Sequence, residues 1–397
     1  MEKKIKKEIL IIPSWYPPDG GGFFKIHAES LHSEYFNVNV LVNRTIGLTS
    51  HKFNDIITVG NPREDQENSI NVFRTSMLNF PLLEKLNLNR WINNSIIHFK
   101  NYLKKYPKPD IIIAHSAIWA GVVAARIKSI YNIPFIIVEH RGRFISENSF
   151  ASSFRKEFHK DVYIKAYNEA SRIVCVSDAL KEGLIQITGI TPEMFPVIPN
   201  MADTDFFTLP EYDRELQPFI FLSIGMLEKV KGYDLLLNAF AQFTDVMEGE
   251  FFLRIGGRGS EMKNLKRLAN DLGIYDRVSF QGQLSRERVR DEMHRSNVFI
   301  SSSHFESFGV ALIEAASTGL PLIATNSGGP QSIINEDNGF LCEAGNSDSL
   351  AKVMEKVYFE YNKFNPELIR QNTVNKYSRA IISGIYHDLI NDVVNEK

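Results

Sequence analysis

Two glutamates in the second half of the chain are placed to bind one ligand at two depths. Glu306 follows the strand candidate NVFISSS, and Glu314 lies eight residues further on, about two helical turns into GVALIEAASTG. Carboxylates at these positions can accept hydrogen bonds from separated hydroxyl groups, and the amides of Phe308, Gly309 and Val310 open the helix, where a phosphate is favoured. The alternative is two surface carboxylates, which the apolar neighbours of Glu314 disfavour.

A lysine and a glycine-rich loop follow two other strand candidates. Lys231 lies in KVKG after FIFLSIG, where its ammonium could neutralise a diphosphate, although an isolated lysine there is normally a solvated side chain. The loop GGRGS, which contains Gly257 and Arg258, opens a helix but lacks the third glycine of a dinucleotide fingerprint, and no acidic residue ends the next strand. An NAD site is therefore not expected.

The first half of the chain also has polar residues at strand ends. The segment DGGG, which includes Gly21 and Gly22, follows the first strand candidate and either lets a ligand approach the backbone or is simply a flexible loop. His140 ends PFIIVEH and is either a ligand contact or a structural histidine. Arg141 and Arg143 follow it as a basic pair suited to an anionic acceptor, or else as solvated surface.

The elements that position these residues form a repeating pattern. Continuous apolar runs alternate with amphipathic helical stretches from end to end, which is typical of parallel sheets covered by helices on both faces. The pattern predicts two doubly wound α/β domains, at 1–205 and 206–375, joined through the proline-rich, acidic stretch 197–218. Ligands bind beyond the carboxyl ends of such strands, so the residues named above are expected to face a cleft between the domains.

The composition indicates a cytoplasmic globular protein. The chain has 397 residues, of which 23% are charged, and a net charge of −2, so nucleic acid is not an expected partner. Cys175 and Cys342 lie in apolar runs and are expected to be buried thiols in a reducing compartment. No apolar run approaches the roughly 18 residues of a membrane span, and the apolar stretch before Pro13 is too short for a secretory signal.

The pattern around the two glutamates resembles that of a known family. The residues SSxxESFGxxxIEAxxxGxPxIATxxGG are similar to the donor-site motif of retaining GT-B glycosyltransferases, the large family four. The segments SxYPPDGGGFF, VIPN, GMLEKVKGYDLLLNAF, GGRGSEMKNLKRLANDLGI and FQGQL follow the order and spacing of that family. The resemblance covers nearly the whole chain. It implies the GT-B fold, with two Rossmann-like domains facing a deep cleft and a C-terminal segment, 376–397, that crosses back to the first domain.

The resemblance implies a role for each candidate residue. Glu314 is expected to bind the ribose hydroxyls, Glu306 to hold the donor sugar and its β-phosphate, and Lys231 to stabilise the leaving diphosphate. His140 is expected to face the outer hydroxyls of the donor sugar. Other positions implied for the donor site are Gly21, Gly22, Gly257, Arg258, Gln283, Leu284, Phe308, Gly309 and Val310, and Arg141 and Arg143 are expected on the acceptor side.

Two positions depart from the family pattern. Met226 follows the strand glycine where the family usually has a second diphosphate-binding arginine, and Met201 stands where glycine is common. Arg258, Lys229 or a residue of the other domain are alternatives for the missing cation. No metal-ligand cluster is visible, so metal is not expected to take part.

The expected activity is retaining transfer of a hexosyl or N-acetylhexosaminyl group from a nucleoside-diphosphate sugar, with UDP favoured over GDP and no separate cofactor. A glycan or undecaprenyl-linked acceptor of bacterial surface-polysaccharide synthesis is expected. The basic and aromatic stretch around Trp91 suggests peripheral contact with anionic lipid at the inner face of the cell membrane. The alternatives are an epimerase or phosphorylase on the same fold, or a non-catalytic sugar-nucleotide-binding subunit, which Met226 favours.

Overall fold

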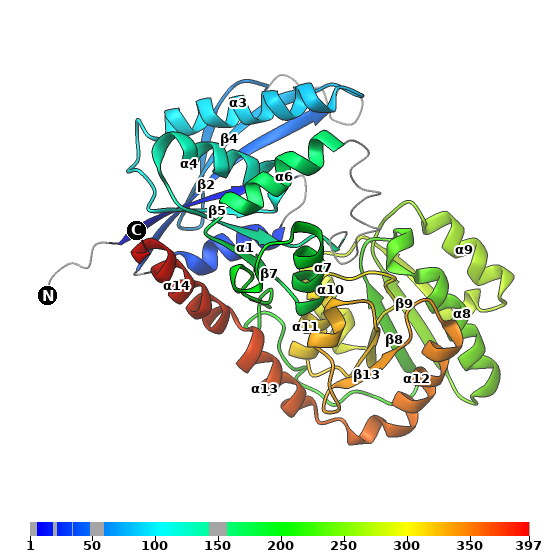
Figure 1. The fold of residues 1–397 in the computed structure, drawn as a ribbon. Helices are drawn as coiled ribbons and strands as arrows, with labels where there is room; N and C mark the ends of the chain where they lie inside the picture. The colour runs from blue at the N-terminus through cyan, green and yellow to red at the C-terminus, as the bar shows by residue number, and fades with distance from the viewer. Residues whose placement is uncertain (1–5, 19–21, 34, 48–58, 143–156, 397) are drawn as a thin grey trace, which may run out of the picture. The chain divides into compact units, whose positions relative to one another are not determined.

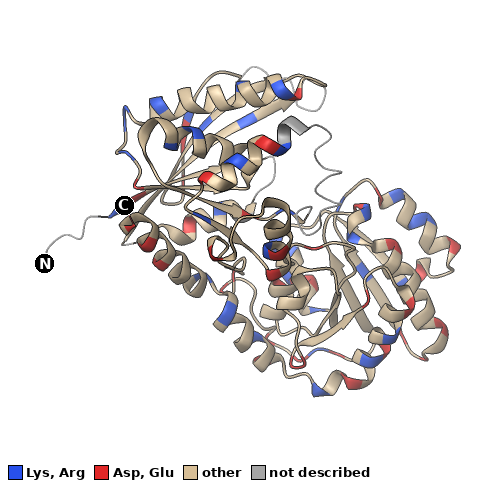
Figure 2. Ribbon diagram, in the orientation of Figure 1, with Lys and Arg blue, Asp and Glu red and all other residues tan. Residues whose placement is uncertain are grey.

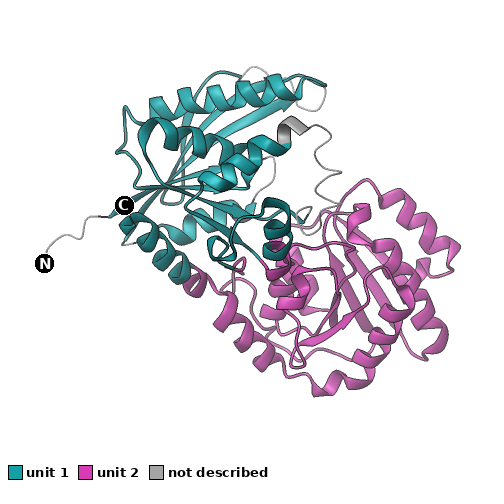
Figure 3. Cartoon of the chain, viewed as in Figure 1, with its two compact units in different colours: residues 1–176, 181–198, 383–397 teal, residues 177–180, 199–382 magenta. Residues whose placement is uncertain are grey.

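The chain divides into two compact units in the computed structural model, which describes residues 6–18, 22–33, 35–47, 59–142 and 157–396. Figure 3 colours unit 1 (residues 1–176, 181–198 and 383–397) and unit 2 (residues 177–180 and 199–382). The units part after residue 198 instead of the expected 205. The reason is local, because Val197 bridges to Cys175 and the amide of Ile198 donates to the carbonyl of Cys175 at 2.9 Å, which keeps this stretch on the first sheet.

Unit 1 is built on a seven-stranded sheet with the order β3-β4-β2-β1-β5-β6-β7 (Figure 1). All its neighbouring strands are parallel except β3 and β4. The sequence pattern did not indicate β3, whose residues REDQE are charged and lie at the sheet edge, where charge discourages pairing with another chain. The strands are β1 Lys7–Pro13, β2 Phe36–Gly47, β3 Arg63–Glu67, β4 Ile70–Asn79, β5 Ile111–His115, β6 Phe135–Glu139 and β7 Arg172–Cys175.

The helices of unit 1 cover both faces of its sheet. The chain moves one way along the sheet from β1 to β4 and the other way from β5 to β7, so right-handed crossovers place α1 on one face and α3, α4 and α6 on the other. The pairs α3–α4 and α4–α6 are in contact, and Figure 1 shows the three together. These helices are α1 Gly22–Leu31, α3 Glu84–Tyr102, α4 Val122–Tyr131 and α6 Glu157–Glu169; α7 Asp178–Thr188 and α14 Arg379–Asn395 contain residues of both units.

The C-terminal segment contributes its last residues, from Ser383 onward, to unit 1. The hydroxyl of Ser383 donates to the carbonyl of Ser30 at 3.1 Å, and the ammonium of Lys7 donates to Asn391 at 2.6 Å. The segment is two helices, because Ser378 adopts an extended conformation between α13 and α14.

Unit 2 is a six-stranded, fully parallel sheet with the order β10-β9-β8-β11-β12-β13. Contacts between α8 and both α9 and α12, and between α11 and α13, place helices on both of its faces. The strands are β8 Phe219–Ile224, β9 Phe251–Gly256, β10 Val278–Gly282, β11 Val298–Ser301, β12 Leu322–Thr325 and β13 Gly339–Cys342. The helices are α8 Tyr233–Val246, α9 Met262–Asp271, α10 Arg286–His294, α11 Val310–Ser317, α12 Ser347–Glu360 and α13 Pro366–Tyr377.

These two sheets confirm the prediction of doubly wound α/β units. Strands such as β5, β6 and β12 are buried along their whole length, which explains their continuous apolar sequences. Figure 2 shows that charged residues gather on helices and loops and are sparse on the inner strands. Both cysteines are buried, as expected.

Each sheet has a point where the strand order reverses. In unit 2 the chain proceeds from β8 outward through β9 and β10 and then returns to β11 on the other side of β8. In unit 1 the corresponding pair is β1 and β5. Such a reversal opens a crevice at the carboxyl ends of the two strands, where ligands bind in doubly wound sheets. The site residues should therefore follow β8 and β11 in unit 2, and β1 and β5 in unit 1.

Candidate active site

Lys231 and Glu306 meet at the strand-order reversal of unit 2. Lys231 follows β8 in the short turn Lys229–Lys231, and Glu306 follows β11. The ammonium Nζ lies 2.5 Å from the carboxylate Oε2, and the two side chains are 30% and 14% exposed. The structure thus brings together two residues that the sequence separates by 75 positions, both accessible to a ligand.

A glycine makes this meeting possible. Gly232 has φ of 61°, and a Cβ atom there would lie 2.2 Å from the carbonyl oxygen of Ser302. The hydroxyl of Ser302 donates to the carbonyl of Lys231 at 3.0 Å, and the amide of His304 donates to the carbonyl of Val230 at 2.8 Å. Any larger residue at 232 would push the Lys231 turn away from the segment that leads to Glu306.

The backbone of Glu306 is fixed from a second side. Its amide donates to the carbonyl of Ser327 at 3.0 Å, and its carbonyl accepts from the amide of Gly329 at 2.7 Å. Gly329 also packs tightly against Phe308, since a Cβ atom at 329 would lie 2.3 Å from the Phe308 Cα. The loop after β12 therefore holds the carboxylate in place and pre-organises it for a ligand.

The helix α11 starts at Val310, two residues later than the sequence suggested. Gly309, at φ of 106°, cannot continue a right-handed helix, and Phe308 is buried, with its ring 5.8 Å from that of Tyr377. Only the backbone of Phe308 and Gly309 is thus suited to ligand binding. The first amides of α11, including that of Val310, have no intrahelical acceptor and suit a phosphate oxygen.

Glu314 lies one helical turn into α11 and is partly buried. Burial raises its pKa to about 7, although the nearby Arg286 lowers it and Asp203 raises it. Arg286 and Arg379 both contact the Asp203 carboxylate, the latter at 2.6 Å, whereas no residue in the described ranges forms a hydrogen bond or ion pair with the Glu314 carboxylate. An unpaired, partly buried carboxyl group is costly for stability and is a common sign of a binding site.

The glycines of the loop after β9 serve close packing between two loops. Gly257 has φ of 141°, and a Cβ atom there would lie 1.8 Å from the carbonyl oxygen of Gly225, at the end of β8. Arg258 is exposed, and its carbonyl accepts from the amide of Leu227 at 2.9 Å. Met226, in the position of the missing arginine, is 62% exposed. Arg258 and Met226 therefore lie on backbone-paired segments directly beyond β9 and β8.

The two remaining donor-site candidates of unit 2 follow β10. Leu284 packs against the end of β9, because a Cβ atom at Gly256 would lie 2.7 Å from its Cδ1 atom. Gln283 is exposed. Of this pair, only Gln283 has a side chain available for polar contact with a ligand.

His140 belongs to a chain of three histidines in unit 1 that sequence reasoning did not find. Its Nε2 atom lies 3.0 Å from Nδ1 of His115 at the end of β5, and Nε2 of His115 lies 3.1 Å from Nδ1 of His27 on α1. His115 and His27 are buried, and the Phe24 ring lies 4.4 Å from that of His115 and 5.2 Å from that of His140. The three imidazoles are linked by hydrogen bonds between ring nitrogens. In each link one nitrogen donates and the other accepts, so the tautomer of each ring determines that of its neighbour.

A buried carboxylate holds the backbone on either side of His140. Glu139 accepts from the amides of His140 and Arg141 at 3.1 and 3.2 Å, from the Tyr167 hydroxyl at 2.8 Å and from the Ser116 hydroxyl at 3.0 Å. Its place in an apolar strand concealed this role from the sequence analysis. Ser116 follows β5 with φ of 70°, a strained conformation for a residue other than glycine and one often found at functional sites.

The other candidates of unit 1 have simple outcomes. Gly22 is the first residue of α1, and Arg141 places its guanidinium 4.6 Å from the centre of the Trp15 ring. Gly21 and Arg143 lie outside the described residues.

The histidine chain predicts loss of stability in acid. Burial lowers the pKa of His27 to about 3, and the pKa of His115 also lies well below its usual value because of burial and the two neighbouring histidines. Between pH 7 and 5 the unfolded chain takes up a proton that folded His27 does not, which lowers the free energy of unfolding by about 2 kcal/mol. Urea unfolding of the full-length chain, followed by tryptophan fluorescence, should show this decrease, and His27→Phe should reduce it. An equal pH dependence in both proteins would contradict a neutral, buried histidine chain.

Two features are absent from the described part of the chain. No group of three or more His, Cys, Asp or Glu side chains there is arranged to hold a metal ion. No helix within the described ranges has the length and apolar character needed to cross a bilayer.

Two family models match this chain in sequence. The model for Glycosyltransferase Family 4 matches residues 51–206, and the model for Glycosyl transferases group 1 matches residues 207–373. A component of human phosphatidylinositol N-acetylglucosaminyltransferase is 31% identical over 192 residues, which cover 48% of this chain and 39% of the human protein. The match therefore spans less than half the length of that relative.

Solved structures share the fold over almost the whole chain. Sucrose-phosphate synthase from Thermosynechococcus elongatus has a TM-score of 0.79 at 20% identity, covering 99% of this chain and 100% of its own. HepE from Anabaena, in complex with UDP, has a TM-score of 0.72 at 19% identity, covering 97% and 100%. The two family models meet near the junction of the two Rossmann-like units, and the same architecture recurs in these structures. The chain belongs to the glycosyltransferases of the GT-B fold, family four, with a C-terminal group 1 domain.

Proposed function

We propose that this protein is a retaining glycosyltransferase that uses a nucleoside-diphosphate sugar, with UDP favoured over GDP, and transfers a hexosyl or N-acetylhexosaminyl group. The observation that carries the proposal is the contact between Lys231 and Glu306 at the strand-order reversal of unit 2. Glu306 lies on the segment that leads into α11, the helix that contains the partly buried Glu314. The bound UDP of Anabaena HepE and the name of the human relative support the choice of donor.

Each of the candidate residues of unit 2 has a separate role in the proposed reaction. Glu314 accepts hydrogen bonds from the ribose hydroxyls, and the amides at the start of α11 bind the diphosphate. Lys231 stabilises the negative charge that develops as the nucleoside diphosphate leaves, and Glu306 orients the lysine and the donor sugar. The acceptor hydroxyl then attacks on the face from which the diphosphate departs, and the departing phosphate oxygen takes the proton, so the anomeric configuration is retained.

Two experiments test the proposal. A thermal-shift panel of UDP, GDP and ADP sugars identifies the donor, since a ligand at 100 times its dissociation constant should add about 2.7 kcal/mol of stability. Single-turnover reactions with that donor, followed by NMR of the anomeric proton, then report the stereochemistry. An inverted product would exclude the retaining mechanism, and binding without any transfer would favour the non-catalytic role that Met226 suggests.

The acceptor side is proposed to receive a glycan or an undecaprenyl-linked sugar of surface-polysaccharide synthesis at the inner face of the cell membrane. Trp91 does not support membrane contact as the sequence suggested, because its side chain is buried and its indole nitrogen donates to the carbonyl of Asn43 at 2.8 Å. The exposed leucines at the start of α3, Leu82, Leu83 and Leu86, are better suited to it.

The pKa of Glu314 predicts how donor affinity depends on pH. The carboxylate form, which accepts hydrogen bonds from ribose, predominates only above a pKa of about 7. The dissociation constant of UDP-glucose should therefore fall by about 10-fold between pH 6 and pH 8. Isothermal titration calorimetry checks this, and Glu314→Gln, which cannot titrate, should bind more weakly with little pH dependence. A pH-independent affinity in the unmodified protein would contradict the ribose contact.

Metal independence is predicted from the cationic groups of unit 2. Lys231 and the α11 amides are placed to neutralise the leaving diphosphate, so the initial rate in excess EDTA should equal the rate with magnesium or manganese. Loss of turnover in EDTA and its recovery on addition of manganese would show that the lysine and the amides do not suffice.

A further inference from the structure

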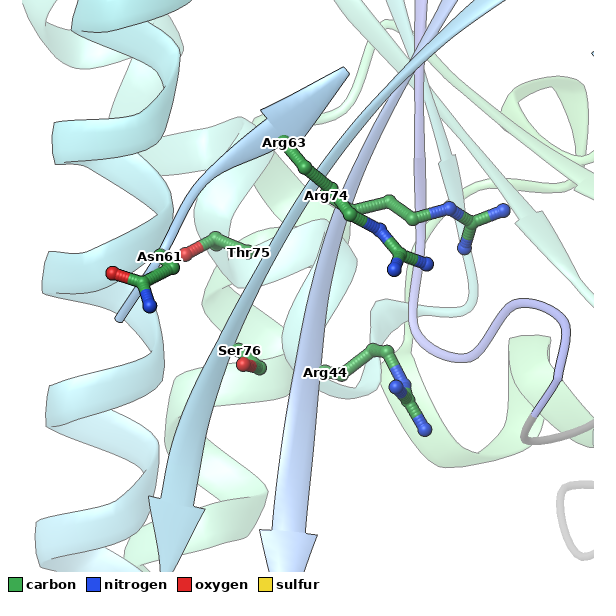
Figure 4. A pocket seen from close by; sticks show the side chains of 6 residues that line it. All are labelled: Arg44, Asn61, Arg63, Arg74, Thr75 and Ser76. Carbon is green, nitrogen blue, oxygen red and sulfur yellow. The ribbon is translucent and has the colours of Figure 1, made fainter. Parts of the chain in front are cut away.

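Unit 1 contains a basic pocket that the proposed roles do not use. The described residues that line it are Arg44, Asn61, Arg63, Arg74, Thr75 and Ser76, of which three are cations and none is acidic (Figure 4). The residues come from β2, β3 and β4 and from the turn before β3. Figure 4 shows the three arginine side chains extending to the same side of these strands.

The strand register explains why the three arginines converge. Arg63 lies opposite Arg74 in the antiparallel pair of β3 and β4, and Arg44 lies opposite Ser76 in the parallel pair of β2 and β4. Like charges directly opposite each other in a sheet destabilise it. Asp65 offsets the repulsion between Arg63 and Arg74, because its Oδ2 atom lies 3.2 Å from one Nε and 2.7 Å from the other.

Arg74 is a structural member of this cluster. It is buried, and its three nitrogens donate to Asp65, to Glu67 and, at 2.8 Å, to the carbonyl of Pro17. Its guanidinium also lies 5.1 Å from the centre of the Tyr16 ring. These contacts fix the wall of the pocket to the segment that follows β1, beside the strand-order reversal of unit 1.

Unlike Arg74, Arg63 has a guanidinium that is accessible to a ligand. Its side chain is 57% exposed, and its ion pair with Asp65 is formed through the Nε atom. Arg44 lines the same pocket three residues before the end of β2. A planar guanidinium donates two parallel hydrogen bonds to a phosphate or carboxylate, so this arrangement is selective for an oxyanion.

The size and position of the pocket identify its ligand further. Its volume of about 30 Å³ is sufficient for a small group such as an oxyanion. It lies on the carboxyl-terminal halves of β2 and β4, the edge of a doubly wound sheet at which substrates bind. We propose that this pocket binds a phosphate group of the acceptor substrate, an inference that rests on the proposed transferase function.

The first test measures phosphate binding without requiring activity. Inorganic phosphate is titrated by calorimetry into the full-length chain carrying Lys231→Ala, which removes the phosphate-binding lysine of unit 2. Adding Arg63→Gln or Arg44→Gln should weaken phosphate binding at least about 10-fold, and Arg63→Lys should weaken it less. The matched control is Arg126→Gln on α4, which removes the same charge from an exposed arginine outside the pocket and should change the dissociation constant less than about 2-fold. Equal effects of Arg63→Gln and Arg126→Gln would overturn the proposal.

The second test separates the acceptor from a lipid headgroup as the source of the phosphate. With a short-chain prenyl-diphosphate sugar as acceptor, Arg63→Gln should raise the acceptor KM at least about 10-fold and leave the donor KM unchanged. Sedimentation with phosphatidylglycerol vesicles should be the same for Arg63→Gln and Arg126→Gln. Loss of vesicle binding in Arg63→Gln alone would overturn the assignment to the acceptor. Absence of transfer, with phosphate binding still dependent on Arg63, would reject the proposed function and leave the phosphate site standing.

Discussion

Replacing Lys231 by alanine is expected to lower kcat at least about 100-fold, which corresponds to a loss of about 2.7 kcal/mol of transition-state stabilisation. The ammonium of Lys231 lies 2.5 Å from the carboxylate of Glu306. Glu306 in turn lies on the segment that leads to the first amides of α11. Met226 replaces the arginine that normally shares the diphosphate charge, so Lys231 should carry an unusually large part of it. Single-turnover kinetics with the donor found by thermal shift measure the effect.

Three further variants control for indirect effects. Lys352→Ala removes an exposed lysine of α12, outside the residues assigned to the site, and should leave kcat within about 3-fold of the unmodified protein, since a solvated charge contributes little. Lys231→Arg should retain part of the activity because it keeps the charge. Met226→Arg should leave turnover unchanged or raise it, because it restores a cation beyond β8. If Lys231→Ala and Lys352→Ala had the same small effect, the protein would be better described as a non-catalytic binding protein.

Replacing Glu306 by alanine is expected to lower kcat about 100-fold while changing nucleotide affinity little. Its carboxylate contacts Lys231 and its backbone is bonded to Ser327 and Gly329, so we expect it to act beside the lysine where the glycosidic bond is proposed to break. Replacing Glu314 by alanine should instead weaken UDP binding about 10-fold, because the lost contacts are with the ribose. The two variants thus separate turnover from affinity.

Calorimetric titration with UDP and steady-state kinetics measure both quantities for each variant. Glu306→Gln serves as the control for shape, since it keeps the side-chain volume and removes only the charge that pairs with Lys231. Circular dichroism confirms folding, which matters because Lys231 loses its partner. Loss of affinity alone in Glu306→Ala, with turnover intact, would show that the two roles are assigned wrongly.

Local sequence patterns were sufficient for the fold. Apolar runs with helical stretches between them predicted parallel sheets, because strand burial and amphipathic helices leave their mark on neighbouring residues. The eight-residue separation of Glu306 and Glu314 was also visible in the sequence, but the two helical turns expected between them were not found, because α11 begins only at Val310 and Glu306 lies in the loop before it. The charged edge strand β3 escaped this reasoning, because its pairing depends on its neighbour β4 and its own residues show no apolar pattern.

The sequence by itself determined that this chain forms two doubly wound α/β units with polar residues after their strands. Only the tertiary structure decided which of those residues meet. Lys231 and Glu306 come together because β8 and β11 are neighbours in the sheet, and strand order is a long-range property that no local pattern records. The histidine chain and the partners of Glu139 have the same origin, since each joins side chains from elements far apart in the sequence. In the arginine pocket, Arg44 meets Arg63 and Arg74 of the β3–β4 hairpin because β2 pairs with β4. Gly257 illustrates the same limit. The sequence shows that a glycine stands there, but the reason for it, the carbonyl of Gly225 directly after β8, is visible only in the tertiary structure.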